Sequence, residues 1–435
     1  MTPRKRIAII GGGVAGLTAA YELLKRGREV VVLEQHAQPG GFASSALVGE
    51  EYVDRYYHFV CRADHELLTL LDELNLRSLL HWNLARTAYY TNQRLYPFTT
   101  PLDLLRFDAM SLRSRVRFGL AVARARSGAD WNAYERDTAV EWLRNEVGDE
   151  AYDVIWRPLL EMKFGAYAGQ VSAAWLRHRI WRVAQSRKGL LNAERFGYLD
   201  GGCKALIDAL RDEVVRRGGE LRLACPVSAI RASHGRVSAL ATDEGDIACD
   251  DAISTVPLPA LVPLLPPEAA HIAAALGRID FTGVVCVLLR LSRRVQDAYW
   301  VNINDPRPGF SGFIEFSNLA PPSPHGPHTV YVPRYMPTSD PGYVAPDVEL
   351  IQAALRGLQI VNPALTEANI EHSVVSRAPF AQPICPTHFS RSVPPLRSAL
   401  GGLYLTDATQ LYPSDRCISG MVGLARRVAD AIVTP

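Results

Sequence analysis

Two short apolar runs near the start of the chain are separated by a helical pattern. Residues 7–10 form a continuous apolar run of strand type, and residues 29–34 (EVVVLE) form a second one. Between them, residues 17–27 space apolar positions three and four apart, as an amphipathic helix does, and Gly27 ends that pattern. Two buried strands joined by a helix predict a parallel βαβ unit.

Strand and helix patterns of the same kind return in the middle and at the end of the chain. A helix is predicted after a Gly201–Gly202 turn, with short strands following at 220–223 and 252–256. Near the end, GLYLTD is typical of a strand that ends at Asp407, and residues 418–432 are typical of a helix. The fold class is therefore predicted as α/β, with distant segments sharing one parallel sheet.

The segments between these units follow other patterns. Residues 64–80 carry an apolar helical stripe, and residues 103–182 are mostly helical. Residues 278–335 alternate as strands, and a helix is predicted at 347–360. This mixture predicts a second region of α+β type, with a mixed sheet and helices.

The helical stretch 102–127 combines an apolar stripe with arginines. Such a basic amphipathic helix can lie on a membrane surface or hold an anionic substrate. Packing of the stripe into the core, with the arginines solvated, is the more common arrangement and is the interpretation we favour. The stripe consists of Leu105, Ala109, Leu112, Val116 and Leu120, and the arginines beside it are Arg113, Arg117 and Arg124.

The loop after the first strand fits the pattern G-x-G-x-x-G. The first glycine allows a tight turn, the second lets a pyrophosphate approach the backbone, and the third lets helix and strand pack closely. The start of the helix offers N–H groups to the phosphates, and an acid after the second strand accepts hydrogen bonds from a ribose. A dinucleotide site is predicted at Gly11, Gly13, Val14, Ala15, Gly16 and Glu34.

A second glycine pair, Gly40 and Gly41, follows Glu34 closely. The acid at position 34 would repel a 2′-phosphate, but it does not distinguish NAD from FAD. An NAD enzyme has no need of the second pair, whereas in a flavin enzyme the chain must double back along the extended cofactor. The pair therefore favours FAD.

The composition limits which binding partners and which cellular compartment we expect for this protein. The 47 basic and 45 acidic residues leave a net charge of +2, so no global field favours nucleic acid. Seven dispersed cysteines without a C-x-x-C pair indicate reduced thiols and a cytoplasmic protein. The apolar run at 7–10 is too short for a signal peptide, and no run approaches the ~20 residues of a membrane span. The histidine spacing indicates no metal site.

The region from residue 7 to 45, together with the end of the chain, resembles a flavoprotein superfamily. This superfamily comprises amine oxidases, protoporphyrinogen oxidases, phytoene desaturases and UDP-galactopyranose mutases, and LYPSDR at 411–416 is similar to the mutase-related subset. The resemblance implies noncovalent FAD in a discontinuous, Rossmann-like FAD-binding domain. The expected bounds are 1–96, 195–275 and 395–435 for that domain, and 97–194 (helices) and 276–394 (sheet) for the substrate domain.

The resemblance also assigns cofactor contacts beyond the glycine loops. Val227 takes the position where the backbone pairs with adenine, and Asp407 takes that of an acid on the ribityl chain. The first turn of the last helix is expected to face the flavin ring, at Ser419, Gly420 and Met421. Members of the family carry an arginine soon after the second glycine pair. Phe42 and Ala43 stand there instead, as expected cofactor contacts, which argues against amine-oxidase chemistry.

Three residues are candidates for catalysis. The resemblance places His58 beside the flavin ring, where it can exchange a proton near neutral pH; a hydrogen-bonded structural histidine is the alternative. Arg416 can neutralise charge on substrate or flavin, or form a surface ion pair. Tyr335 can line the substrate cavity or pack in the core. We assign Lys163 a structural role.

The predicted function is an FAD-dependent oxidoreductase that abstracts hydride from a small organic substrate and passes electrons to oxygen or another acceptor. Two alternatives stay open. One is a mutase-like flavoenzyme acting on a nucleotide sugar, and the other is a flavin-binding protein without catalysis. The expected partner is a small molecule, anionic or lipid-linked, and peripheral membrane contact is a further option.

Overall fold

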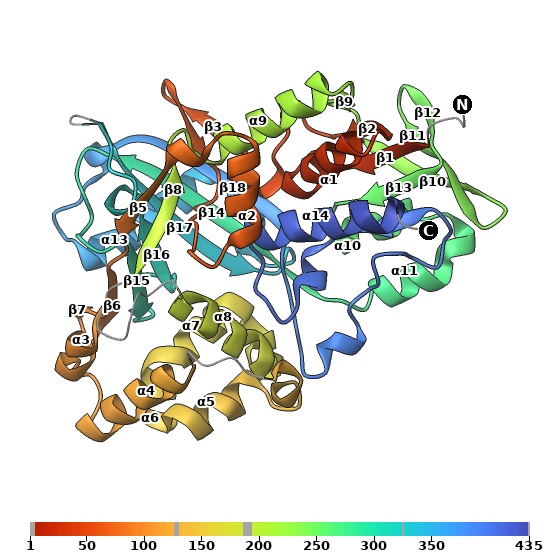
Figure 1. Ribbon diagram of the computed structural model, residues 1–435. Coiled ribbons are helices and arrows are strands. Elements are labelled where there is room, and N and C mark those ends of the chain that lie inside the picture. Colours follow the sequence, from red (N-terminus) through yellow and green to blue (C-terminus); the bar gives the residue numbers. More distant parts are fainter. Residues whose placement is uncertain (1–4, 126–129, 186–193, 324–325, 434–435) are drawn as a thin grey trace.

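Five parallel strands from distant parts of the chain form one sheet in the computed structural model, which describes residues 5–125, 130–185, 194–323 and 326–433 (Figure 1). The strand order is β19-β13-β1-β2-β9, and every neighbouring pair is parallel. The strands are β1 (Arg6–Ile10), β2 (Glu29–Leu33), β9 (Glu220–Arg222), β13 (Asp251–Ser254) and β19 (Leu403–Leu405). The two ends of the chain therefore share one sheet, as the sequence predicts.

Helices cover one face of this sheet, and a three-stranded sheet covers the other. Ile7 and Ile9 pack with the helices, whereas Ala8 and Ile10 pack with the small sheet. Burial on both faces explains why the strands read as continuous apolar runs. The covering elements are α1 (Val14–Lys25), α2 (His65–Glu73), α9 (Gly202–Arg216) and α14 (Ile418–Val433), and β10 (Val227–Ser233), β11 (Arg236–Thr242) and β12 (Gly245–Ala248).

A seven-stranded mixed sheet forms the second region, in the order β18-β14-β17-β16-β15-β6-β7. Only the β6–β15 pair in this sheet is parallel, and helix α13 (Asp347–Val361) packs on one face. The strands are β6 (Thr87–Thr91), β7 (Arg94–Pro97), β14 (Phe281–Leu291), β15 (Trp300–Asn304), β16 (Gly312–Glu315), β17 (His328–Met336) and β18 (Ile370–Pro383). Strands β6 and β7 thus belong to this sheet, although the predicted boundary at 96 assigns them to the other region. The division into domains otherwise stays a prediction.

A layer of helices occupies the lower left of Figure 1, below the mixed sheet. Its helices are α3 (Pro101–Arg106), α4 (Leu112–Ala125), α5 (Ala139–Val147), α6 (Asp149–Ala151), α7 (Arg157–Phe164) and α8 (Ala173–Gln185), with a π-helical turn at Tyr152–Trp156. Among all described helices, none is long and apolar enough to cross a membrane.

The structure corrects the interpretation of the stretch 102–127. Residues 107–111 separate α3 from α4, and Glu150 binds the backbone N–H and hydroxyl of Ser111 just before α4 begins. The predicted apolar stripe does not face the core, because Phe118, Ala121 and Ala125 take the buried side of α4. The large apolar stripe residues Leu105, Leu112, Val116 and Leu120 are all exposed.

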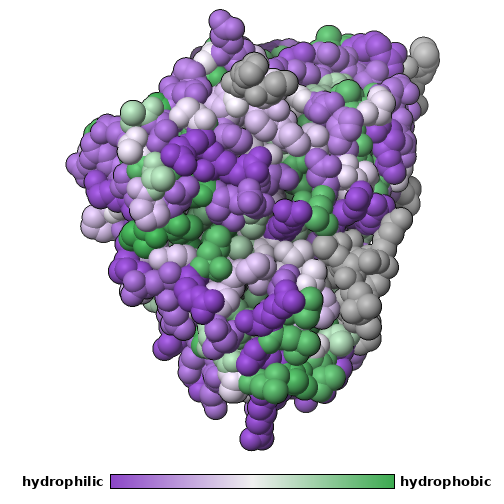
Figure 2. Space-filling view, turned by 90° about the vertical axis from the view of Figure 1, so that its left-hand side faces the viewer, coloured by the Kyte–Doolittle hydropathy of each residue, from purple (hydrophilic) through white to green (hydrophobic). Residues whose placement is uncertain are grey.

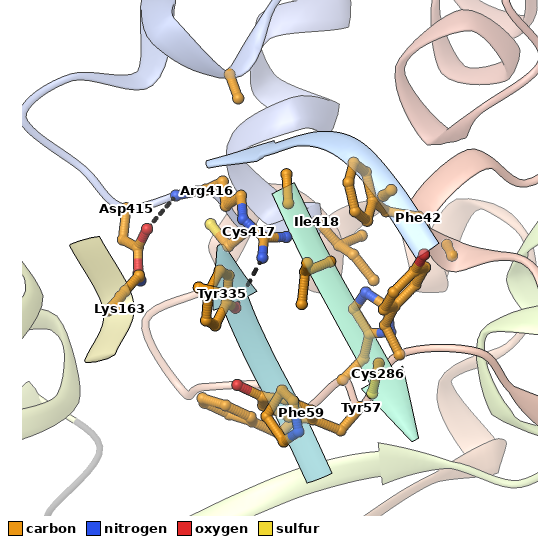
Figure 3. A pocket seen from close by; sticks show the side chains of 18 of the residues that line it. Phe42, Tyr57, Phe59, Lys163, Cys286, Tyr335, Asp415, Arg416, Cys417 and Ile418 are labelled. Atoms are coloured by element: carbon orange, nitrogen blue, oxygen red, sulfur yellow. Dashed lines mark hydrogen bonds and ion pairs between the residues drawn. The ribbon is translucent and has the colours of Figure 1, made fainter. Parts of the chain in front are cut away.

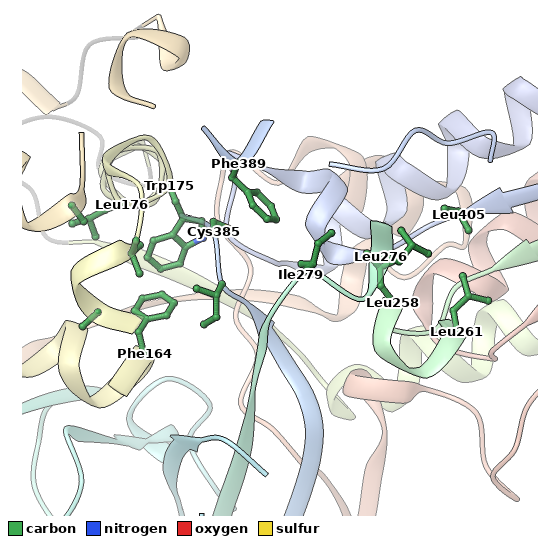
Figure 4. Packing of buried hydrophobic residues seen from close by; sticks show 14 of the residues in the cluster. Phe164, Trp175, Leu176, Leu258, Leu261, Leu276, Ile279, Cys385, Phe389 and Leu405 are labelled. Carbon is green, nitrogen blue, oxygen red and sulfur yellow. The ribbon is translucent and has the colours of Figure 1, made fainter. Parts of the chain in front are cut away.

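One buried apolar cluster joins the helical layer to the parallel sheet (Figure 4). Trp175 of α8 packs edge-on against Phe164 of α7, with ring centroids 5.1 Å apart. The cluster continues through Ile279 to Leu405 of β19. This contact fixes α7 and α8 over the cavity described below.

Shorter elements complete the fold. The predicted helix 64–80 is α2 alone, because Arg77–Leu79 forms a separate 3₁₀ turn and the chain then enters a strand. The other short strands are β3 (Ser45–Val48), β4 (Glu51–Asp54), β5 (Leu80–Leu84) and β8 (Arg195–Leu199). The other short helices are α10 (Leu258–Leu261), α11 (Ala270–Leu276) and α12 (Pro341–Val344).

Candidate functional site

A cavity of about 1780 Å³ begins at the carboxyl ends of the parallel strands and extends between the mixed sheet and the helical layer. This edge of an open α/β sheet is where ligands bind. Most of the residues predicted from the sequence line it, although they come from five separate parts of the chain. They are Gly11, Gly13, Val14, Ala15, Glu34, Gly40, Gly41, Phe42, Ala43, His58, Val227, Tyr335, Asp407, Arg416 and Met421.

The glycine loop brings the start of α1 to the end of β1. Gly11 has a φ of +103°, and a Cβ atom on Gly16 would lie 1.9 Å from the carbonyl oxygen of Gly11. Only glycine at position 16 permits this close contact, so its role is packing, and it does not line the cavity. Gly13 is the N-cap of α1, and a Cβ there would meet nothing nearer than 3.8 Å. The helix start is therefore open to a phosphate.

Glu34 follows β2 and is buried at the same edge of the sheet. Its Oε2 accepts a hydrogen bond from the N–H of Gly12 (2.7 Å), and its Oε1 accepts one from the N–H of His36 (2.9 Å). These bonds fix the carboxylate while leaving each oxygen a further lone pair. The geometry suits recognition of a ribose diol.

The second glycine pair lies against the first loop. Gly40 and Gly41 both have positive φ values, +133° and +56°, and the N–H of Gly40 donates to the carbonyl of Gly12 at 2.9 Å. A Cβ on Gly40 would clash with the backbone of Ser44 at 2.9 Å. The pair thus turns the chain back along the cavity, as expected for a cofactor that extends beyond its nucleotide half. Together with Glu34, these loops fit a flavin dinucleotide.

Asp407 follows β19 directly, and its side chain lines the cavity. It is buried, and its carboxylate accepts hydrogen bonds from the N–H groups of Thr409 (2.7 Å) and Leu258 (3.3 Å). Burial raises the pKa of this carboxyl. The predicted contact with the ribityl chain stays a prediction, and the position of Asp407 agrees with it.

The first turn of α14 meets the cavity through other side chains than predicted. The hydroxyl of Ser419 accepts a hydrogen bond from the N–H of Leu67 on α2 (3.2 Å), so it faces the neighbouring helix. Gly420 packs on Leu411, which a Cβ would approach to 2.9 Å. Neither residue lines the cavity, because Ser419 faces α2 and Gly420 faces Leu411. The lining side chains here are Cys417, Ile418 and Met421.

Charged side chains gather in the cavity where the loop before α14 meets α7, α8 and β17 (Figure 3). Asp415 lies in the loop before α14 and forms ion pairs with Lys163 of α7 (3.3 Å) and Arg179 of α8. Arg416 donates to the hydroxyl of Tyr335 on β17 (3.0 Å). We call Lys163, Arg179, Tyr335, Asp415 and Arg416 the charged cluster.

The charged cluster carries more positive than negative charge, because three basic side chains share one carboxylate. Burial, helped by the charges of Arg179 and Arg416, lowers the pKa of Lys163 to about 7 against the opposing effect of Asp415. Although burial opposes it, the same basic groups hold the pKa of Asp415 well below its usual range. Lys163 can therefore exchange a proton at neutral pH while the arginines stay charged.

Arg416 also lies over the ring of Phe42, with its guanidinium carbon 5.1 Å from the ring centroid. The resemblance leads one to expect an arginine near position 42, and the sequence has none there. The fold instead brings an arginine from the other end of the chain to this place. The positive charge beside position 42 thus comes from Arg416, a residue distant in sequence that the fold brings close.

His58 lies in the cavity wall near the charged cluster, after β4. Burial lowers its pKa, so the imidazole is neutral at neutral pH. Its Nδ1 is 4.0 Å from Asp54, too far for a hydrogen bond. Asp54, His58 and Cys203 bring three potential metal-ligand atoms within 4.8 Å of one another. Burial raises the pKa of the Cys203 thiol, and Asp54 already accepts the N–H of Cys203, so the trio is a poor metal site.

Three members of the charged cluster are not predicted from the sequence as site residues: Lys163, Arg179 and Asp415. Lys163 and Arg179 lie in no motif, and each sits on a helix far in sequence from Asp415. Only the packing of α7 and α8 against the last loop brings them together.

An apolar arm of the cavity extends from the charged cluster to α3 and α4. It is lined there by small and apolar side chains of these two helices. The lining residues of the arm include Pro101, Leu104, Phe118, Gly119, Val122 and Ala123.

Comparison with known proteins gives one family over nearly the whole chain. Residues 14–433 match the family described as flavin containing amine oxidoreductase. Coproporphyrinogen III oxidase of Mycobacterium leprae is 30% identical over 322 residues, covering 67% of this chain and 68% of that protein. Protoporphyrinogen oxidase 2 of Arabidopsis thaliana is 25% identical over 226 residues; the match covers 50% of this chain and only 41% of the relative's length.

Solved structures share the fold at low sequence identity. A putative protoporphyrinogen oxidase from Exiguobacterium sp. 255-15 has a TM-score of 0.75 at 20% identity, with 99% of each chain covered. Reduced UDP-galactopyranose mutase has a TM-score of 0.76 at 16% identity, covering 99% of this chain and 94% of that one. The matches confirm the predicted α/β fold, the flavin cofactor and the superfamily.

Proposed function

Because the chain belongs to the flavin-containing amine oxidoreductase family and is thus a flavin-dependent oxidoreductase, we propose that it uses FAD to oxidise a small organic substrate that carries negative charge. The substrate loses hydride from a C–H bond, and the electrons pass to oxygen or another acceptor. The observation that carries the proposal is the excess of positive charge in the charged cluster, which lines the same cavity as the glycine loops.

FAD fits the long cavity because different groups of residues there suit its ADP half and its flavin half. The glycine loops and Glu34 suit the ADP half, and Asp407 suits the ribityl chain. When bound, the flavin supplies a two-electron acceptor. Its ring would then lie near Phe42 and Arg416, next to the charged cluster.

The positive charge of the cluster favours anionic substrates over protonated amines. Arg179 and Arg416 can bind a carboxylate or phosphate, which guanidinium groups recognise through paired hydrogen bonds. A protonated amine would be repelled by the same groups. The proposal therefore places an anionic group of the substrate near the arginines and does not assign amine oxidation.

Lys163 is suited to receive the proton that accompanies hydride loss from an alcohol or amine carbon. Its pKa of about 7 leaves a large neutral fraction at physiological pH, so its amine can accept a proton from the substrate heteroatom. Asp415, 3.3 Å away, then stabilises the resulting ammonium. His58, also neutral and in the cavity wall, is the second candidate for this role.

Anaerobic mixing tests the proposal directly. Holoprotein is mixed with carboxylated alcohols, neutral isoprenoid alcohols and simple amines, and bleaching of the flavin near ~450 nm is followed. Carboxylated compounds should bleach the flavin at lower concentrations. Arg179→Gln and Arg416→Gln should each weaken substrate binding by about 10- to 100-fold, since a charge-assisted hydrogen bond contributes about 1.5–3 kcal/mol.

Arg307→Gln is the matched control, because Arg307 pairs with Asp305 outside the cavity. It should leave substrate binding unchanged. Equal bleaching by amines, or unchanged binding in both cavity variants, would overturn the proposed substrate charge.

The charged cluster also favours a second candidate, a mutase acting on a nucleotide sugar, because the same basic groups can bind a diphosphate. The two functions differ in their use of electrons. A mutase leaves the oxidised flavin unbleached and interconverts sugar isomers only after prior reduction. An oxidoreductase is reduced by its own substrate.

We also propose that the protein works in the cytoplasm. The seven cysteines are all thiols rather than disulfides in the described chain, and six of them are buried. Burial raises the pKa of Cys286 to about 12, which makes an inert thiol. Buried thiols of this kind suit a reducing compartment.

A further inference from the structure

Five large apolar side chains are exposed on neighbouring helices of the helical layer. Leu102 and Leu105 of α3 are 52% and 48% exposed, and Leu112, Val116 and Leu120 of α4 are 61%, 49% and 57% exposed. The three residues on α4 are spaced four apart, so they share one side of the helix. We call these five residues the leucine face.

The leucine face is unusual for a surface in contact with water alone. Single exposed apolar residues are common, but an aligned group on adjoining helices marks an interaction site. Figure 2 shows apolar surface gathered at the lower end of the molecule, the end at which the helical layer lies in Figure 1.

Arginines flank the leucine face. Arg106 follows Leu105 on α3, and Arg113 follows Leu112 on α4; both are exposed. Within the described parts of the chain, neither forms an ion pair or a side-chain hydrogen bond. Arg117 and Arg124, farther round α4, are held by the end of α5 through Glu146. The free positive charge therefore lies next to the leucines.

The same two helices contribute to the cavity lining. Leu104 of α3 and Val122 of α4 line its apolar arm. Ala123 both lines the cavity and is exposed, and it lies one helical turn beyond Leu120 on the side of the leucine face. The apolar arm and the leucine face thus adjoin at Ala123.

From these observations we propose that the leucine face docks on an anionic lipid bilayer. The five apolar side chains enter the acyl boundary, and Arg106 and Arg113 meet the lipid headgroups. Docking places Ala123 and the adjoining apolar arm next to the bilayer, so the substrate is an amphiphile with an apolar body and an anionic head. This last step rests on the proposed function, whereas the docking itself does not.

Flotation of the holoprotein with vesicles tests the docking. Vesicles contain either equal parts of phosphatidylglycerol and phosphatidylcholine or phosphatidylcholine alone. The wild type should float with the anionic vesicles. The triple variant Leu112→Asp/Val116→Asp/Leu120→Asp should bind at least tenfold more weakly, and Arg106→Ser/Arg113→Ser should lose most of the preference for anionic lipid.

Val344→Asp/Val348→Asp is the matched control. Val344 and Val348 are 73% and 59% exposed, but they lie at α12 and α13, away from the leucine face. This variant should bind vesicles like the wild type. Flavin content in each variant reports whether the fold is kept, and all the altered side chains are exposed.

Two results would overturn the docking proposal. One is equal vesicle binding by wild type and triple variant. The other is no binding by the wild type, with light scattering showing a dimer that the triple variant loses; the face would then join two copies of the chain. If docking holds but anionic amphiphiles fail to bleach the flavin, the substrate proposal fails while the docking surface stands.

Discussion

Asp407 offers the sharpest test of cofactor binding by a single residue. Its carboxylate is buried at the cavity and held by two backbone N–H groups. Asp407→Ala removes the acceptor for the ribityl hydroxyls and should weaken FAD binding about 10- to 100-fold, from a loss of about 1.5–3 kcal/mol. Titration of FAD into the apoprotein measures this. Asp407→Asn keeps a hydrogen-bond acceptor, so its affinity for FAD should lie between those of the wild type and the alanine variant. Wild-type affinity for FAD in the alanine variant would contradict the assignment.

Lys163 should impose a pH dependence on flavin reduction. Its pKa is lowered to about 7, so the lysine is protonated and inactive as a base below that pH and neutral above it. Substrate-driven reduction should therefore rise as the pH rises through about 7. Lys163→Gln should slow reduction and remove this rise. Stopped-flow reduction at a series of pH values measures both effects.

His58 provides the comparison for Lys163. Its pKa is lowered from the ordinary value, so it would titrate only at more acidic pH. His58→Ala should keep the flavin, and it should keep the rise near pH 7 if Lys163 is the base. A rise that persists in Lys163→Gln and disappears in His58→Ala would assign the proton to the histidine.

At the scale of elements, the junction of β1 and α1 depends on Gly16. A Cβ at this position would lie 1.9 Å from the backbone oxygen of Gly11, which cannot move without shifting β1. Gly16→Ala should therefore destabilise the protein by about 3 kcal/mol and reduce its flavin content. Thermal unfolding and the ratio of flavin to protein measure this. Gly169→Ala is the control, because a Cβ there meets nothing within 4 Å.

At the scale of the whole molecule, the flavin should stabilise both ends of the chain together. The cavity is lined by the loops after β1 and β2 and by the segment from β19 to α14, so the cofactor contacts segments that meet only in the fold. FAD at 100 times its Kd should add about 2.7 kcal/mol to the free energy of unfolding. Removal of flavin should lower the unfolding temperature, and FAD, but not NAD, should restore it. Equal restoration by NAD would contradict a flavin site.

The sequence by itself determined the parallel sheet and the glycine loops at the ends of its strands. Continuous apolar runs, glycine spacing and the acid at position 34 are patterns of residues close together in sequence, so they can be recognised without knowledge of the fold. Gly11, Gly13, Glu34 and Gly40 all line the cavity, as these local patterns indicate, and so does Asp407, which the family resemblance assigned.

The tertiary structure alone decided the charged cluster. Lys163, Arg179 and Arg416 become neighbours only because α7, α8 and the last loop pack together, and no local pattern records such a contact. The leucine face was misread for a related reason. Helical periodicity shows that one side of α4 is apolar, but only the packing of Phe118 and Ala121 shows that the core lies on another side, leaving Leu112 and Leu120 exposed.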